Sequence, residues 1–311
     1  MRIIYLGTPD FATIPLEALA RDERYTIVGV VTQPDRPAGR GGTLRPPPLK
    51  EAALRLGIPV LQPETLRDPA AAAWIAALRP DVGVVAAYGE LLRKHILAIP
   101  PLGYVNIHPS LLPRHRGPSP VAGAILAGDA ETGVTLMRLD TKMDSGPILA
   151  QQRVPLPPAA RTGPLTVELF RLGAGLLVET LARYAAGEIV PTPQDDSQAT
   201  YTRLLRKADG AIDWGQPAVQ IERMTRAYDP WPGAHTTWRG QPLKVIAARV
   251  HADWAGDVPP GTLLDRDRGI WVATGAGALE LLTVQPAGKR PLAAAEWRRG
   301  LRDLDGARLG T

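Results

Sequence analysis

The central part of the chain contains two short apolar runs, DVGVVAA at residues 81–87 and YVNIH at residues 104–108. The first run is almost wholly apolar, which is typical of a strand buried on both faces of a parallel sheet. Similar runs precede it at residues 3–6 and 25–31, and the Ala-rich segment 68–78 has helical character. Strands that alternate with helices predict an α/β domain with a Rossmann-like, mostly parallel sheet and flanking helices.

The character of the sequence changes near residue 190. Residues 191–197 read PTPQDDS, a composition typical of a linker between domains. Beyond them, short β-type runs are separated by Gly and Pro, which predicts a small antiparallel barrel or sandwich. We therefore expect a first domain at residues 1–190, a linker at 191–203 and a second domain at 204–311.

The 311 residues have an ordinary globular composition, 45% hydrophobic and 22% charged, so a wholly disordered chain is excluded. The net charge of +5 favours a polyanionic partner such as nucleic acid. The absence of cysteine excludes disulfides, thiolate catalysis and Cys-ligated metals. No segment has the character of a membrane helix or a secretory signal, so we expect a cytoplasmic protein without a membrane partner.

Asn106 and His108 are the first candidate catalytic residues. They lie two positions apart in the predicted strand 104–108, so their side chains project from the same face. The carboxyl end of a strand in an α/β sheet is the usual place for an active site. The alternative interpretation is a structural histidine in the core.

Two common nucleotide-binding motifs are missing from the sequence. The turn after the first predicted strand, Gly7-Thr8-Pro9-Asp10, lacks the second and third glycines of a dinucleotide fingerprint. No Walker-type phosphate loop occurs anywhere in the chain. Chemistry based on NAD, FAD or ATP is therefore disfavoured.

Two further segments carry charged residues. Asp140 and Asp144 lie four positions apart in a turn-forming stretch, where one of them can orient a histidine and stabilise its cation. The alternative is a loop with two solvated acids. Residues 34–48 contain three arginines and no apolar periodicity, which predicts a flexible basic loop that becomes ordered on a polyanion. The alternative there is a mobile surface loop without a function in binding.

Taken in order along the chain, these segments resemble the methionyl-tRNA formyltransferase family, and the resemblance spans nearly the whole chain. One such motif is weak, whereas the ordered combination is specific. The resemblance implies a formyltransferase fold followed by a small OB-like β-barrel domain. The matching motifs are GTPDF at 7–11, TQPDRPAGRG at 32–41, AAYG at 86–89, Asn106-x-His108 with SLLP at 110–113, GDAETGVT at 128–135, IDW at 212–214, RAYDPWPG at 226–233 and QPAGK at 285–289.

The resemblance implies transfer of a formyl group from 10-formyltetrahydrofolate to the α-amine of methionine on initiator tRNA. It assigns the catalytic roles to Asn106, His108 and Asp144, and it implies no metal. Asn106 would donate to the developing oxyanion. His108 would donate to the same oxygen or relay a proton from the amine to the leaving folate nitrogen. Asp144 would hold the imidazole and raise its pKa.

The resemblance also assigns residues to the two substrates. Tyr88 and Gly89 would line the pterin pocket, and the basic loop and the second domain would bind the tRNA, with the protein acting as a monomer. Arg40 would probe the end of the acceptor stem. The stretch expected to contact the folate is Ser110, Leu111, Leu112 and Pro113, and the residues expected to contact the tRNA are Arg36, Arg40, Arg45 and Lys207.

Three residues beside the predicted site differ from the usual family pattern. Pro109 stands where Gly is common, His115 where Trp is usual and Pro147 where an acid is common. None of them removes a chemical group with an assigned role, so they affect only the expected shape of the loops. Three alternatives remain open: a formyltransferase that acts on an amino-sugar nucleotide or another small amine, a formyltetrahydrofolate hydrolase, and a non-catalytic RNA-binding protein.

Overall fold

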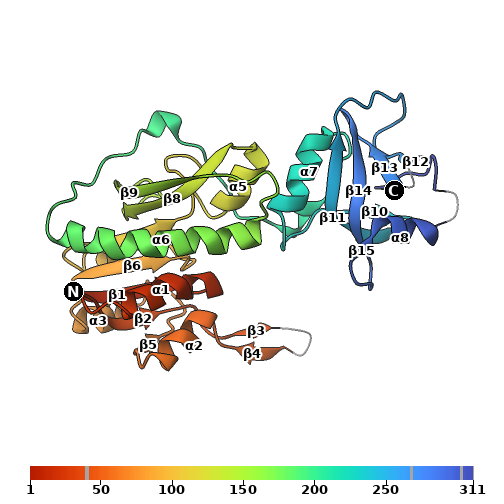
Figure 1. Cartoon of the computed structure of the whole chain (residues 1–311). Helices are drawn as coiled ribbons and strands as arrows, with labels where there is room; N and C mark the ends of the chain where they lie inside the picture. Colours follow the sequence, from red (N-terminus) through yellow and green to blue (C-terminus); the bar gives the residue numbers. More distant parts are fainter. Residues whose placement is uncertain (39–41, 267–268, 302–303, 311) are drawn as a thin grey trace. The chain divides into compact units, whose positions relative to one another are not determined.

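The computed structural model describes all residues except 39–41, 267–268, 302–303 and 311 (Figure 1). The chain folds into two compact units, each with more contacts within itself than to the other. The predicted boundaries at 190 and 204 stay a prediction, because the second unit also takes in two short segments from within the first predicted domain. The first unit is Met1–Pro120, Glu131–Pro155 and Thr166–Thr202; the second is Val121–Ala130, Leu156–Leu165 and Arg203–Thr311.

The first unit is built on one seven-stranded sheet, and the prediction of a mostly parallel sheet is confirmed (Figure 1). The first five strands in the spatial order are parallel to one another, and the last two are antiparallel. The sixth strand runs antiparallel to the fifth, which carries Asn106 and His108, and the seventh runs antiparallel to the sixth. The order is β5 (Val60–Leu61), β2 (Thr26–Val31), β1 (Arg2–Gly7), β6 (Val82–Ala86), β7 (Tyr104–His108), β8 (Glu131–Arg138) and β9 (Ile148–Pro155).

Helices cover both faces of this sheet, which explains its continuous apolar strands. The long helix α6 runs along one face of the sheet (Figure 1). Its residues Phe170 and Leu177 lie there in a buried cluster with Val84 and Ile107. On the other face, Tyr104 belongs to a second buried cluster, to which α3 contributes. The helices are α1 (Thr13–Ala20) after the short turn η1 (Asp10–Ala12), α2 (Pro48–Arg55), α3 (Pro69–Ala77), α4 (Lys94–Leu97) and α6 (Thr162–Ala185).

The basic segment 34–48 differs from the expected irregular loop. Its described residues form a two-stranded antiparallel ribbon of β3 (Arg36–Ala38) and β4 (Thr43–Arg45). The sequence shows no strand pattern there because a narrow ribbon buries no face and so needs no apolar alternation.

The second unit is an antiparallel sheet with its own core. The described strands pair in the order β10-β11-β14-β13-β12, with β15 beside β14, and this path does not close on itself. The second unit is therefore an antiparallel half-barrel, which confirms the prediction of a small antiparallel β-domain. Its elements are α5 (Pro120–Ala127), η3 (Lys207–Gly210), α7 (Ala218–Ala227), β10 (His235–Trp238), β11 (Gln241–His251), β12 (Leu263–Arg266), β13 (Gly269–Ala273), β14 (Ala278–Pro286), β15 (Leu292–Ala293) and α8 (Ala294–Arg299).

The segment between α6 and the second unit contains only the short turn η2 (Asp196–Gln198). It runs back over the sheet of the first unit, where Thr192 pairs with Ile148 and Tyr201 pairs with Arg116. Across the described residues, none of the helices combines the length and apolarity that crossing a membrane requires.

Candidate active site

Strand β7 places Asn106 and His108 side by side at its carboxyl end. Val85 of the parallel strand β6 pairs with Asn106, and Met137 and Thr135 of the antiparallel strand β8 pair with Asn106 and His108. Neighbouring residues of β7 point to the opposite face, so the two polar side chains share one face. They are 8% and 4% exposed, respectively. The strand thus presents an amide and an imidazole at the point where the sheet changes from parallel to antiparallel.

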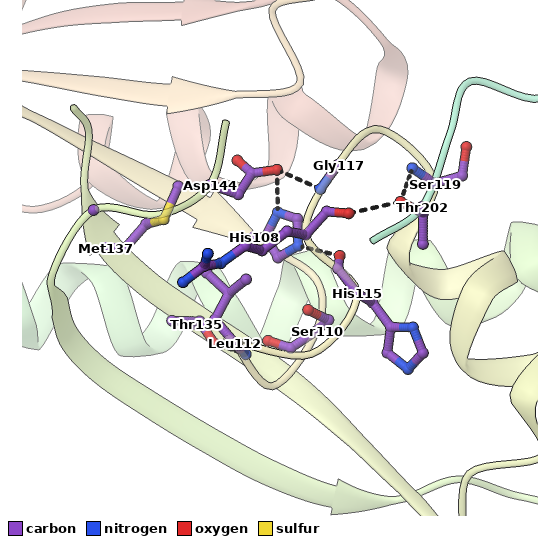
Figure 2. A network of polar contacts seen from close by, with 12 residues as sticks. His108, Ser110, Leu112, His115, Gly117, Ser119, Thr135, Met137, Asp144 and Thr202 are labelled. Carbon is purple, nitrogen blue, oxygen red and sulfur yellow. Dashed lines mark hydrogen bonds and ion pairs between the residues drawn. The ribbon is translucent and has the colours of Figure 1, made fainter. Parts of the chain in front are cut away.

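Both ring nitrogens of His108 face an oxygen acceptor (Figure 2). Nε2 lies 3.0 Å from the carbonyl oxygen of His115, and Nδ1 lies 3.7 Å from Oδ2 of Asp144. A carbonyl oxygen only accepts hydrogen bonds, so Nε2 carries the proton in this arrangement. The contact to Asp144 is longer than a direct hydrogen bond and becomes an ion pair when Nδ1 is protonated.

Burial lowers the pKa of His108, while the charge of Asp144 and the carbonyl of His115 oppose that shift. The imidazolium of His115 adds to the lowering when it is charged. At neutral pH the His108 ring is therefore mainly neutral, with Nδ1 ready to accept a proton. A proton taken up there is stabilised by the carboxylate 3.7 Å away.

Asp144 is the aspartate that the fold brings to His108. Its Oδ2 accepts a hydrogen bond of 2.7 Å from the backbone N–H of Gly117 (Figure 2). Asp140, the other candidate, accepts hydrogen bonds from Ser145 and from the backbone of Lys142. Of the two acids that the sequence left open, only Asp144 faces the histidine.

The turn that carries Asp144 has an unusual backbone. Asp144 has φ +49°, in the left-handed region that non-glycine residues rarely adopt. At Gly146 a Cβ atom would overlap the carbonyl oxygen of Arg138, so only glycine fits. Such a backbone persists only where the surrounding contacts hold it, which makes the neighbours of this turn important for the site.

Asn106 differs from its neighbours because its side chain has no hydrogen bond to another described residue. Its amide is nearly buried at 8% exposure, yet it is not among the fully enclosed polar groups. A nearly buried polar group without a partner is costly unless a ligand or water pairs with it. The Asn106 amide therefore fits a group that donates to a bound substrate.

The loop after β7 carries the predicted folate-contacting residues, and hydrogen bonds between Thr135 and its backbone hold it in place. The Thr135 hydroxyl donates to the Ser110 carbonyl at 2.7 Å and accepts from the backbone N–H of Leu112 at 3.1 Å. Gln151 of β9 donates both to the Leu112 carbonyl and to Thr135. The Ser110 hydroxyl is buried and donates to the Arg114 carbonyl at 2.7 Å. Leu112 is buried, whereas Leu111 and Pro113 are partly exposed.

The predicted pterin region lies in the turn after β6. The side chain of Tyr88 is part of the core, and burial raises the pKa of its hydroxyl, with a smaller contribution from Glu90. The carbonyl of Tyr88 accepts a hydrogen bond of 3.1 Å from the Thr8 hydroxyl. Gly89, at φ +94°, has open space where a Cβ atom would lie. The structure therefore leaves Gly89 accessible and uses Tyr88 to hold the turn.

Comparison with known proteins decides the family. Residues 1–181 match the family model described as "Formyl transferase", and residues 204–302 match "Formyl transferase, C-terminal domain". The chain is 72% identical over 310 residues to "Methionyl-tRNA formyltransferase" of Roseiflexus sp. (strain RS-1), with 100% of this chain and 95% of that protein covered. The chain belongs to the methionyl-tRNA formyltransferase family.

Other relatives and solved structures agree with this assignment. "Methionyl-tRNA formyltransferase" of Chloroflexus aggregans is 64% identical, with 97% of each chain covered. The N-formyltransferase from Helicobacter canadensis has the same fold, with a TM-score of 0.68 at 16% identity and coverage of 91% and 98%. HypX from Aquifex aeolicus gives a TM-score of 0.61 at 20% identity; 96% of this chain matches 46% of that longer protein. The predicted family and fold are thus confirmed.

The residues predicted to bind tRNA lie apart from the His108 site in the sequence. Arg36 and Arg45 of this formyltransferase pair directly across the ribbon of β3 and β4. Arg36 forms an ion pair of 3.3 Å with Glu64, and Arg45 is exposed. Arg40 lies outside the described residues. Lys207 is exposed at the start of η3 in the second unit.

Sequence reasoning missed several groups that shape this formyltransferase site. The His115 carbonyl and the Gly117 N–H are backbone groups, which no residue pattern reveals. Thr135 closes the motif at 128–135 but carried no assigned role, and Gln151 carried no signal at all. Pro109 and Pro147 only flank the site, while His115 contributes its carbonyl and its ring points away from His108 (Figure 2). The described residues contain no group of three His, Asp or Glu side chains arranged for a metal ion.

Proposed function

We propose that this protein transfers the formyl group of 10-formyltetrahydrofolate to the α-amino group of methionine on initiator tRNA. The observation that carries the proposal is the convergence of three side chains at one strand end: His108 and Asp144 in contact, and the unpaired amide of Asn106 on the same face. That set occurs in a chain 72% identical to a methionyl-tRNA formyltransferase. The folate donor supplies an activated formyl group.

Asn106 stabilises the charge that develops on the formyl oxygen. Its amide N–H is already positioned on the rigid strand β7 and has no competing partner among the described residues. A preorganised donor of this kind typically contributes about 3–4 kcal/mol to transition-state stabilisation, because no reorganisation is needed when the charge appears.

His108 moves the proton. The attacking amine loses a proton as the new C–N bond forms, and the leaving folate nitrogen gains one as the old bond breaks. The neutral ring accepts a proton at Nδ1, and Asp144, 3.7 Å away, stabilises the resulting imidazolium. The hydrogen bond from Nε2 to the His115 carbonyl fixes the ring orientation during both steps.

The features around this centre fit a flat, amphipathic folate. Gly89 offers an open approach at the end of β6, and the loop of Ser110, Leu111, Leu112 and Pro113 offers apolar side chains and backbone groups. The HypX structure of the same fold was obtained in complex with tetrahydrofolic acid. We propose the same class of ligand for this loop.

The proposal that tRNA is the partner rests on the positive charge of the chain. Arg36 and Arg45 lie on a ribbon that is exposed at its strands, and residues 200–311 contain 16 Lys and Arg against 12 Asp and Glu. Cationic side chains on separate elements suit contacts to successive phosphates. We propose that the protein acts as a cytoplasmic monomer and that Arg40 and Lys207 also contact the tRNA.

The test compares acceptors in one assay. The protein is incubated with 10-formyltetrahydrofolate and, separately, with methionyl initiator tRNA, an amino-sugar nucleotide, or water alone. The proposal expects turnover only with the charged tRNA. Faster turnover with the amino-sugar nucleotide, or release of formate without an acceptor, would replace the proposed activity by one of the two enzymatic alternatives.

A further inference from the structure

Gln194 lies in the segment expected to be a plain linker, yet its side chain joins the two loops that meet at His108. Its amide nitrogen Nε2 donates to the Asp144 carbonyl at 2.9 Å and to the Gly146 carbonyl at 2.7 Å. Its amide oxygen accepts from Nε and Nη2 of Arg116 at 3.0 and 2.8 Å. The side chain thus uses both of its donors and both acceptor positions within the first unit.

Both ends of this bridge lie next to the atoms that contact His108. Arg116 stands between His115, whose carbonyl accepts from His108, and Gly117, whose N–H donates to the Asp144 carboxylate. At the other end, the backbone carbonyl of Asp144 accepts a hydrogen bond from the side-chain amide of Gln194. The Gln194 side chain therefore links the backbone of the Asp144 turn to the side chain of Arg116, the residue between His115 and Gly117.

Arg116 is a buried cation that depends on this arrangement. Its side chain is 2% exposed, and besides Gln194 it pairs with Asp196 at 2.7 Å and donates to the Tyr201 hydroxyl at 3.3 Å. All three partners come from the segment 194–201. A buried guanidinium with several charge-assisted hydrogen bonds is a rigid anchor, because breaking any one of them leaves part of the charge unpaired.

The backbone of the same segment strengthens the attachment. Arg116 donates its N–H to Thr200 at 2.9 Å and accepts from Thr202 at 2.7 Å, and the Thr202 hydroxyl accepts from Ser119 (Figure 2). Thr192 and Ile148 exchange two hydrogen bonds of 2.8 Å beyond the Asp144 turn. The segment therefore spans both loops.

The Asp144 turn needs such support. Asp144 lies at φ +49°, and the turn approaches the Arg138 backbone so closely that Gly146 is required. Two hydrogen bonds from one amide to carbonyls 144 and 146 oppose relaxation of this turn. We infer that Gln194 is a positioning residue, which sets the distance between the Asp144 carboxylate and His108 and thereby the protonation of the imidazole during formyl transfer. The catalytic part of this inference rests on the proposed function.

The test uses Gln194→Met, which keeps the length of the side chain and removes its hydrogen bonds to Arg116, Asp144 and Gly146, together with the longer one of 3.8 Å to the Met137 sulfur. Gln198→Met is the matched control, because Gln198 lies in the same segment and is exposed, and among the described residues its side chain forms a hydrogen bond only to Asp195. NMR titration of the His108 ring, done without substrates, reports the pKa. Kinetics with charged tRNA give kcat and KM.

Gln194→Met is expected to lower the pKa of His108, because a displaced Asp144 stabilises the imidazolium less. We expect kcat to fall about 10- to 100-fold, since small misplacements of a catalytic group cost that much, while the KM for tRNA changes by less than about twofold. Gln198→Met should change none of these. In an Asp144→Asn background, Gln194→Met should leave the His108 pKa where Asp144→Asn alone puts it.

A lower melting temperature with an unchanged His108 pKa would show that Gln194 is only structural and would overturn the inference. If Gln194→Met does not fold, Gln194→Glu is tested in its place. The glutamate keeps an oxygen that accepts from Arg116 and loses the N–H donors to the Asp144 and Gly146 carbonyls. An unchanged kcat in Gln194→Glu would also overturn the inference. The titration needs no formyl donor, so a failure of the proposed function leaves its result intact. If the parent protein formylates tRNA but Gln194→Met leaves the pKa of His108 unchanged, the role of Gln194 is rejected while the proposed function stands.

Discussion

Asn106 contributes one chemical property to the site, a nearly buried amide without a partner among the described residues. Asn106→Ala is expected to lower kcat by about 100- to 1,000-fold, since the lost donor acts on charge that appears in the transition state. Asn106→Asp, of the same shape but without N–H donors, should be equally impaired. Tight binding of tRNA should persist in both variants, and a loss confined to KM would contradict the role.

Asp144 acts on His108 through charge, and the sign of that effect can be tested. Because the carboxylate raises the pKa of His108 against the lowering by burial, Asp144→Asn should lower the pKa further below its ordinary value of 6.5. The acid limb of the pH profile of kcat/KM should then move to lower pH, and the maximal rate should fall as the imidazolium loses its partner. NMR titration of the ring measures the shift directly.

Asp140→Asn is the control for that experiment. Asp140 lies in the same loop but pairs with Ser145 and Lys142, and the asparagine oxygen can still accept from Ser145. We expect the His108 pKa to stay unchanged. A rise of the pKa in Asp144→Asn, or equal shifts in both variants, would show that the 3.7 Å contact does not control the ring.

At the residue scale, the sequence predicts that Asn106 and His108 share one face of a strand, because a strand places alternate residues on the same face. The choice of Asp144 over Asp140 came only from the resemblance, since spacing within a turn does not determine which carboxylate faces a distant histidine. The His115 carbonyl and the bridging amide of Gln194 could not be predicted. The first is backbone, and the second depends on a long-range path of the chain.

At the scale of elements, Thr135 of β8 links the strand pairing to the substrate loop. Its buried hydroxyl has three hydrogen-bond partners, the Ser110 carbonyl, the Leu112 N–H and Gln151. Thr135→Val, which has nearly the same shape, should lower the free energy of unfolding by about 1–3 kcal/mol, because it leaves buried backbone groups unpaired. It should also raise the KM for the folate as the loop loosens. Denaturant unfolding and steady-state kinetics measure the two effects.

Strand β8 supplies a matched control. Thr132 is buried in the same strand, but its hydroxyl has no partner among the described residues. Thr132→Val should therefore be neutral or stabilising, and the KM for the folate should stay unchanged. Equal losses of stability in both variants would mean that the loss of a hydroxyl, and not the support of the loop, decides the outcome.

Sequence patterns at this scale predict buried strands better than exposed ones. The runs at 81–87 and 104–108 lie in β6 and β7 because both strands are covered on two faces. The ribbon of β3 and β4 was expected to be irregular, since an exposed ribbon leaves no apolar trace. The segment 191–203 reads as a linker from its prolines and acids, although its polar side chains are bonded to the active-site loops.

At the scale of the whole molecule, the chain has a net charge of +5 and folds into two units. The positive charge is the basis for the proposed binding of tRNA. Lys207→Ala should weaken binding of tRNA and reduce the slope of log affinity against log salt by about one, the loss expected for one phosphate contact. Lys207→Arg should restore both, because it keeps the charge. Filter binding over a salt series gives the slope, and a slope unaffected by Lys207→Ala would remove this residue from the tRNA interface.

The division into units could be predicted only in part. The change of composition near residue 190 predicts a domain boundary, which stays a prediction, and the antiparallel strands of the second unit follow the predicted runs. The inclusion of 121–130 and 156–165 in the second unit leaves no trace in composition, because it depends on contacts between segments far apart in the chain. The described strands of that unit form an antiparallel half-barrel, in agreement with the expected small β-domain.

The most direct test of the account follows the formyl carbon itself. The protein receives 10-formyltetrahydrofolate labelled with ¹³C in the formyl group together with methionyl initiator tRNA, and mass spectrometry then locates the label. The account predicts labelled N-formylmethionine esterified to the tRNA, formed by the parent protein and almost absent with the combined Asn106→Ala and His108→Ala variant. Label found only in formate, or equal labelling of methionine by the parent protein and the variant, would contradict it.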